Sequence, residues 1–221
     1  MTLTTINLAA LGDTINLTTE VTGTLPTANG GTNSTATTFV NAASNVTGTL
    51  PVANGGTAIT SGFVNGITAA SQWRLTTDLI GPVDPISANL EAVDTDGYAT
   101  IGSPMAVSSG IWTFPTTGVW LIRGHGDLYF NGDSRHQHLA IHTTLNDSSY
   151  SLAASGYSFI QQTESNATQT HIDVDFLFDV TDTSQCKCKF AFENVTNTSV
   201  VLAGGSSVSY TWFTFTRLGD T

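Results

Sequence analysis

Basic residues are scarce in this chain. It contains 6 Lys and Arg against 17 Asp and Glu, which gives a formal net charge of −11 at pH 7. Both lysines, Lys187 and Lys189, lie in a CKCK stretch, and the arginines are scattered. Affinity for nucleic acids and for anionic membrane surfaces rests on clustered Lys and Arg. We therefore expect no nucleic-acid partner and no binding to an acidic membrane.

Long apolar runs are also missing. A membrane-spanning helix needs about 20 consecutive apolar residues, and no stretch of the chain approaches this, so we expect no membrane insertion. The opening MTLTTINLAALGDT has neither the basic start nor the sustained apolar core of a secretory signal. This favours synthesis in a cytoplasm without export by that route.

Cysteine is limited to Cys186 and Cys188. Two residues apart on a strand, their Cα atoms would lie roughly 6.5–7 Å apart on one face, at or beyond the usual limit for a disulfide. The spacing favours two buried thiols that pack as small apolar groups. A Cys-x-Cys metal pair is the alternative.

Catalytic motifs are not found either. The chain has no G-x-S-x-G, no H-E-x-x-H and no phosphate-binding loop. Asp173 and Asp175 share one strand face. Carboxylates placed in this way are typical of a solvated or ion-paired edge, and no partner acid for the geometry of a glycosidase can be identified. We expect no enzymatic activity and no cofactor.

What the chain does contain is unevenly distributed. Before Arg74 there is no Lys or Arg, and the acids are Asp13 and Glu20. Most of the Trp, Tyr and Phe lie after residue 97. The C-terminal two-thirds of the chain therefore contain the apolar residues needed for a sizeable core, and we expect the N-terminal region that precedes them to be extended.

A repeated segment marks that N-terminal region. VTGTLPTANGGT begins at Val21, and VTGTLPVANGGT begins at Val46. Its Pro lacks an N–H donor, and NGG supplies the positive φ of a sharp turn. The regularly placed large apolar groups are Leu25, Phe39, Leu50 and Phe63. One chain cannot build a core from so few, so we predict a shaft in which identical chains intertwine and share these side chains. A flexible linker is the alternative.

The GTLPxANGGT repeats, over about residues 16–66, resemble those of bacteriophage tail-fibre proteins, where they precede a distal globular tip. The resemblance implies a homotrimeric shaft over residues 21–74, after a virion-attachment segment at residues 1–20. It also implies a place in the virion, with a tail or capsid protein as the partner of the N-terminal region. It brings no catalytic residues.

From Leu75 onward, apolar and polar residues alternate with the period of a β-strand. GVWLIRGHGDLYF places Trp120 and Ile122 on one face and Arg123 and His125 on the other. THIDVDFLFDV, RHQHLAIH and QCKCKFAFE alternate in the same way, with turn clusters such as NGD and LNDSS between them. SYTWFTFTRL is expected to be apolar on both faces. The pattern predicts an all-β sandwich or jelly roll over residues 75–221.

Two segments of this region resemble the jelly rolls of complement heads and tumour necrosis factor (TNF). They are SSGIWTFPTTGVWLIRG and the closing SSVSYTWFTFTRLGD. The resemblance, over about residues 95–219, implies a ten-stranded, two-sheet sandwich that assembles as a trimeric head. VTDTSQCKCKF departs from the complement-type pattern, which weakens any inference about calcium.

In trimers of this family, the sheet containing the strands like GVWLIRGHGDLYF and THIDVDFLFDV lies near the three-fold axis. This implies that Arg123 and His125 lie close to Asp173 or Asp175, within or between subunits. We expect this trimer-axis network to set the register of the subunits.

His136, His138 and His142 share one strand face, and on a three-fold axis they could bind a transition metal. Solvated histidines on the outer sheet are the preferred interpretation. For the receptor, a host-surface glycan or protein, the candidate contacts are loop and edge residues: Asn146, Asp147, Tyr150, Tyr157 and Gln161. Ordinary loop roles for them stay open.

Together these features predict a homotrimeric virion fibre of a bacteriophage, whose jelly-roll head attaches to the host cell surface. A capsid-attached head fibre or decoration protein has the same architecture and is the first alternative. A secreted bacterial adhesin is the second, and it would need an export route.

Overall fold

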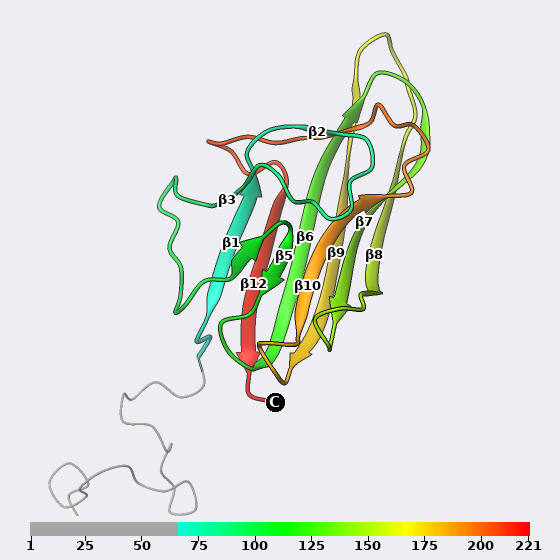
Figure 1. The fold of residues 1–221 in the computed structure, drawn as a ribbon. Helices are drawn as coiled ribbons and strands as arrows, with labels where there is room; N and C mark the ends of the chain where they lie inside the picture. The colour runs from blue at the N-terminus through cyan, green and yellow to red at the C-terminus, as the bar shows by residue number, and fades with distance from the viewer. Residues whose placement is uncertain (1–65) are drawn as a thin grey trace, which may run out of the picture. The chain divides into compact units, whose positions relative to one another are not determined.

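The computed structural model of the protein describes residues 66–221. All regular structure in these residues consists of antiparallel β-strands, β1 to β12, in two sheets (Figure 1). They include no helix long and apolar enough to cross a membrane. The predicted attachment segment, the repeats and most of the shaft lie outside the described residues. So do the four shaft side chains, Leu25, Phe39, Leu50 and Phe63.

The larger sheet has seven strands. In spatial order it contains β2 (Leu79–Ile80), β11 (Val201–Leu202), β6 (Gly118–Phe130), β12 (Trp212–Gly219), β1 (Ala70–Leu75) and β3 (Leu90–Ala92). β9 (Thr168–Val180) pairs with β6 along its whole length. Because β12 and β11 share the other edge of β6, this long strand is the centre of the sheet.

The smaller sheet has five strands. In spatial order they are β4 (Ala106–Ser108), β5 (Ile111–Thr113), β10 (Lys187–Glu193), β7 (Ser134–Thr144) and β8 (Ser151–Ile160). The first hairpin shows how local sequence sets the connection. Ser109 and Gly110 separate β4 from β5, with φ of 50° and 79°. A two-residue turn with positive φ at both positions matches the twist of the flanking strands.

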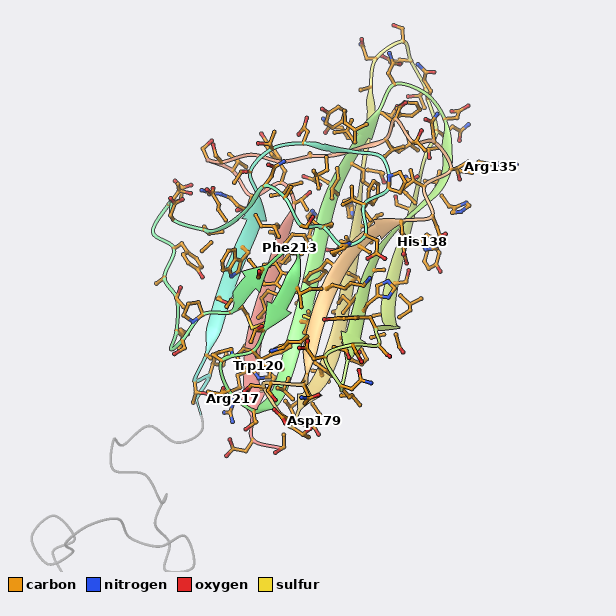
Figure 2. All side chains as sticks on the ribbon, in the orientation of Figure 1. Trp120, Arg135, His138, Asp179, Phe213 and Arg217 are labelled. Atoms are coloured by element: carbon orange, nitrogen blue, oxygen red, sulfur yellow. The ribbon has the colours of Figure 1, made fainter. Side chains whose placement is uncertain are left out.

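Alternate residues of the long strands face a shared core, as their period-two pattern predicts. Its centre is aromatic: the ring centroid of Trp112 lies 4.8 to 6.2 Å from those of Trp73, Phe190, Phe213 and Phe215. Burying one such side chain stabilises the fold by roughly 1.5–3 kcal/mol. Figure 2 labels Phe213 at the middle of this core and Trp120 nearer one end.

That end of the sandwich, which we call the base, holds both ends of the described chain. Arg217 donates hydrogen bonds to the Thr117 carbonyl at 2.8 Å and to Thr68 Oγ1 at 3.1 Å. β6 starts at the base and runs to the opposite end, which we call the apex (Figure 1). Arg217 lies at the base in Figure 2, and Arg135 lies toward the apex.

The predicted all-β antiparallel sandwich is confirmed, but two details differ. β1 begins at Ala70 and pairs with β12 as far as Arg74, so these residues belong to the sandwich and not to the shaft. The expected boundary at Leu75 was therefore too late. The described sandwich has twelve strands instead of ten, because two-residue strands such as β2 and β11 extend the larger sheet.

Candidate assembly surface

The outward side chains of β9, β6 and β12 form a broad surface, which we call the open face. Across the β6–β9 pair, His125 lies opposite Asp173 and Arg123 lies opposite Asp175. Arg123 and the two aspartates are exposed, while Ile122, which alternates with them, is fully buried in the core. The structure thus brings all four residues of the predicted polar network onto one surface of a single chain.

His125 lies between two carboxylates on this surface. Its Nδ1 is 2.8 Å from Asp173 Oδ1 on β9, and its Nε2 is 3.2 Å from Asp127 Oδ1 on its own strand. A neutral imidazole carries one N–H and an imidazolium carries two. Each ring nitrogen of His125 thus has a carboxylate oxygen within hydrogen-bond distance.

Aromatic stacking holds the same imidazole in place. The His125 ring lies parallel to Trp212 of β12, with centroids 5.2 Å apart and an interplanar angle of 12°. On its other side it stacks on His171 of β9 at 5.8 Å and 21°. We call the stacked rings of Trp212, His125 and His171 the aromatic ladder. Arg123 lies beside it, with its guanidinium carbon 5.8 Å from the Trp212 ring centroid. It contacts the indole through a cation–π interaction instead of pairing with Asp175.

Sequence analysis missed Trp212 because the last strand was expected to be apolar on both faces. That expectation was wrong. Phe213 and Phe215 are fully buried, whereas Trp212, Thr214 and Thr216 are partly exposed on the open face. The alternation of threonines with phenylalanines was the available signal, since it marks which side of the strand meets solvent.

Near the base the open face carries an apolar strip, which lies between Asp175 and Asp179 of β9. Leu121 of β6 lies opposite Leu177 of β9, and Leu177 is 58% exposed. Leu218, near the end of β12, is also exposed. The open face thus combines an apolar strip near the base with the charged and aromatic ladder above it.

A second apolar surface lies along β8, the edge strand of the smaller sheet. Leu152, Tyr157 and Phe159 are each more than half exposed. β8 runs beside β9, where Ser158 Oγ lies 2.7 Å from Thr170 Oγ1. A Cβ at Gly156 would lie 2.2 Å from the carbonyl oxygen of Asp173, so glycine is required for this approach. We call this surface the β8 edge.

The three histidines of β7 lie on the outer face of the smaller sheet. The ring centroids of His136 and His138 are 5.6 Å apart, but the three do not form one cluster. His138 contacts Asn194 and the Tyr157 ring, whereas His136 contacts Thr196. His142 Nε2 lies 3.3 Å from Glu193 Oε1. Within residues 66–221, no group of three or more His, Cys, Asp or Glu side chains has a geometry suited to a metal ion. The geometry therefore gives no support to the metal alternative.

The candidate receptor residues lie at opposite ends of the sandwich. Asn146 and Asp147 belong to the turn between β7 and β8 at the base, and Gln161 follows β8 at the apex. The intervening strand has 10 residues, or roughly 33 Å at about 3.3 Å per residue. Asn146 also has a local role, since its Oδ1 accepts hydrogen bonds from the backbone N–H groups of Ser148 and Ser149.

The two aromatic candidates also have partners within the sandwich. Tyr150 is partly buried, and the Lys189 ammonium lies 5.5 Å from its ring centroid. Tyr157 is exposed on the β8 edge, against His138. The five predicted contacts thus do not form one surface.

Both cysteines are buried and unpaired, as predicted. They face the core from β10 and its preceding residue, and Cys188 pairs in register with Trp112. Burial raises the pKa of the Cys188 thiol far above its ordinary value. These thiols act as small core side chains.

No protein-family model and no curated protein matches the chain. Among solved structures it is similar to Eiger TNF from S. frugiperda, with a TM-score of 0.51 and 13% identity over 71% of this chain and 96% of that one. It also matches murine APRIL at pH 5.0, with a TM-score of 0.46 and 9% identity over 68% of this chain and 98% of that one. The similarity to Eiger TNF shows the fold: the described sandwich is a TNF-like jelly roll.

Proposed function

We propose that this chain is the subunit of a homotrimeric bacteriophage fibre, whose sandwich forms a head for attachment to the host cell surface. The open face is the main observation in support of a trimer. Leu177 and Leu121 form an exposed apolar strip on a sheet whose other side is a packed core. A contiguous apolar strip bordered by charged residues is typical of a protein–protein interface.

A closed ring of identical chains needs two different surfaces on each subunit, which fit one another. The apolar strip near the base of the open face supplies one of them, and the base end of the β8 edge supplies the other. Packing the exposed Leu152 of one subunit onto the Leu121–Leu177 strip of the next removes apolar surface near the base from water and leaves the upper end of the open face uncovered. Three-fold closure also matches the symmetry of an intertwined three-chain shaft.

The attachment role rests on the N-terminal repeats and on where the chain enters the sandwich. The repeats resemble those of phage tail fibres, which carry a globular tip. Residue 66 lies at the base, beside Arg217 and Asp220. In a fibre the apex is then the end available to a receptor, on loops that a rigid sandwich positions. Three copies of the site in one head, and several fibres on a particle, add avidity to a weak single contact.

The trimer is tested by measuring the mass of the purified full-length protein by analytical ultracentrifugation. Replacement of Leu177 by Lys places a charge in the apolar strip and is expected to shift trimer toward monomer. Leu145→Lys is the matched control, because Leu145 is 68% exposed in a loop outside both apolar surfaces. A monomeric wild-type protein overturns the trimer, and a trimeric Leu177→Lys variant overturns this choice of interface.

The attachment role is tested with the same protein on host bacteria. The wild-type trimer is expected to bind the cells and to reduce infection by competing with the virus. A trimer that neither binds nor competes overturns the attachment role. Gold-labelled antibodies viewed by electron microscopy would then decide whether the protein decorates the capsid.

A further inference from the structure

A cleft of about 240 Å³ lies at the upper end of the open face, toward the apex. Its polar lining comes from β6, β9 and the segments on either side of them: Asp78, Asp127, Tyr129, Gln169 and Tyr210. Pockets for drug-sized ligands have volumes of roughly 300–1,000 Å³. This smaller cleft suits a ligand the size of a single sugar ring.

The first carboxylate in the cleft is fixed by two donors. The Gly204 N–H donates to Asp78 Oδ1 at 2.9 Å, and the Tyr129 hydroxyl donates to Asp78 Oδ2 at 2.5 Å. Each carboxylate oxygen keeps a further lone pair. The hydrogen bond to Asp78 raises the pKa of Tyr129, so the phenol stays protonated and continues to donate.

The second carboxylate, that of Asp127, is positioned by His125 of the aromatic ladder. Asp127 Oδ1 lies 3.2 Å from His125 Nε2, and its side chain is 44% exposed. Its other oxygen has no partner among the described residues. Two carboxylates held before a ligand arrives are strong acceptors for hydroxyl donors, and little ordering is needed on binding.

Tyr210 gives the cleft an apolar wall. A Cβ at Gly205 would lie 3.0 Å from Cδ2 and Cε2 of Tyr210, so the ring packs directly on the Gly205 backbone. The side chain is 45% exposed. An aromatic ring with one open face packs against the C–H face of a sugar while polar groups bind its hydroxyls.

The charge of the lining selects among sugars. The lining contains Asp78 and Asp127 but no Lys, Arg or His. Phosphate, sulfate and carboxylate groups would meet two like charges there. The best match is a ligand with several hydroxyl donors, one C–H face and no negative charge.

We propose that this cleft binds one neutral hexose unit of a host-surface glycan. Vicinal hydroxyls donate to Asp78 and Asp127, Gln169 supplies an amide, and Tyr210 packs on the ring. The proposal rests on the proposed attachment function, and it names the ligand class and the site. It moves receptor recognition away from the loops that sequence analysis favoured.

The experiment uses the full-length protein and saturation-transfer NMR with the methyl glycosides of glucose, galactose and mannose, and with glucosamine and sialic acid as charged comparisons. At least one is expected to bind in the millimolar range. Asp127→Asn and Tyr210→Ala are each expected to weaken that binding at least five-fold. Asp147→Asn, in the turn at the base, is the matched control and leaves it unchanged. Far-ultraviolet circular dichroism and the ultracentrifugation mass check that each variant is folded and assembled.

Each outcome counts. Binding that both cleft variants lose and the control retains supports the proposal. Binding of no glycoside, binding unaffected by Asp127→Asn and Tyr210→Ala, or binding of glucosamine or sialic acid alone overturns it. If the protein is a trimer but binds no hexose, the proposed hexose site is wrong and the proposed trimeric fibre is unaffected. A monomer that binds through the cleft overturns the trimer and keeps the site.

Discussion

His125 Nδ1 lies 2.8 Å from Asp173 Oδ1, across the pair of strands at the centre of the open face. The two residues are 48 positions apart in the chain and meet because β6 and β9 pair over their full length. Asp127 lies at the other ring nitrogen, so one imidazole links two carboxylates that would otherwise repel each other.

A double-mutant cycle measures this link. His125→Ala, Asp173→Ala and the double variant are compared by urea denaturation at neutral pH. The coupling free energy is expected to be about 1 kcal/mol, because the carboxylate is half exposed and solvent screens the pair. Coupling near zero would mean that Asp127 and aromatic stacking position the imidazole without help from Asp173.

The Arg74 side chain provides a second test. It is 1% exposed, with Nε 2.7 Å from Glu91 Oε1 and Nη2 2.6 Å from Asp94 Oδ1. Removing the acids leaves a buried charge unpaired, whereas removing the arginine leaves acids that reach solvent. The double variant Glu91→Gln, Asp94→Asn is expected to lose about 3 kcal/mol of stability.

Arg74→Met is the partner experiment. Methionine fills much of the same volume without a charge, so the expected loss is below that of the double variant. Both are measured by urea denaturation. A larger loss for Arg74→Met would show that the guanidinium acts mainly by packing and hydrogen bonding.

His138 predicts a pH dependence. It is 8% exposed, beside Tyr157 and Asn194. Burial lowers its pKa below the ordinary 6.5, His136 lowers it further, and Glu193 opposes the shift. The unfolded chain then binds the proton more readily, so stability falls as pH drops through 6.5 toward the lower pKa of the native state. Above that range this group has no effect.

The measurement is the thermal midpoint of wild type and of His138→Gln from pH 8 to about pH 5. The variant is expected to lose less stability on acidification. Parallel curves for wild type and His138→Gln would contradict the assignment.

The buried thiols predict an absence of reactivity. The thiolate is the reactive form, and burial both hides the Cys188 sulfur and raises its pKa. A disulfide reagent at pH 8 is expected to label neither cysteine in the native protein and both in guanidinium. Rapid labelling of the native protein would show that β10 opens locally.

Much of the fold was predictable because alternation is a local property. Trp120 and Ile122 alternate with Arg123 and His125, and this order alone assigns one side of β6 to the core. The same argument placed Cys188 inside. The start of the sandwich was not predictable, since β1 is short and its polar Arg74 is buried by acids that follow about twenty residues later.

The sites were harder to predict for the same reason. Asp127 and Asp173 lie on recognisable strands, so their common face was accessible to sequence reasoning. Asp78 lies in a short turn, and its place in the cleft depends on Tyr129 and Gly204. Loop residues such as Asn146 and Gln161 are close in sequence, yet a strand carries them to opposite ends of the sandwich.

By itself, the amino-acid order determined the strand period, the inward faces, the inert cysteines and the acidic character of the surface. These follow from the chemistry of each residue and its near neighbours. Strand pairing decided the rest: which carboxylates share His125, that Tyr210 walls a cleft, and that apolar side chains remain exposed on two surfaces. Such relations join residues far apart in the chain, and they exist only once backbone hydrogen bonds set one strand's register against another.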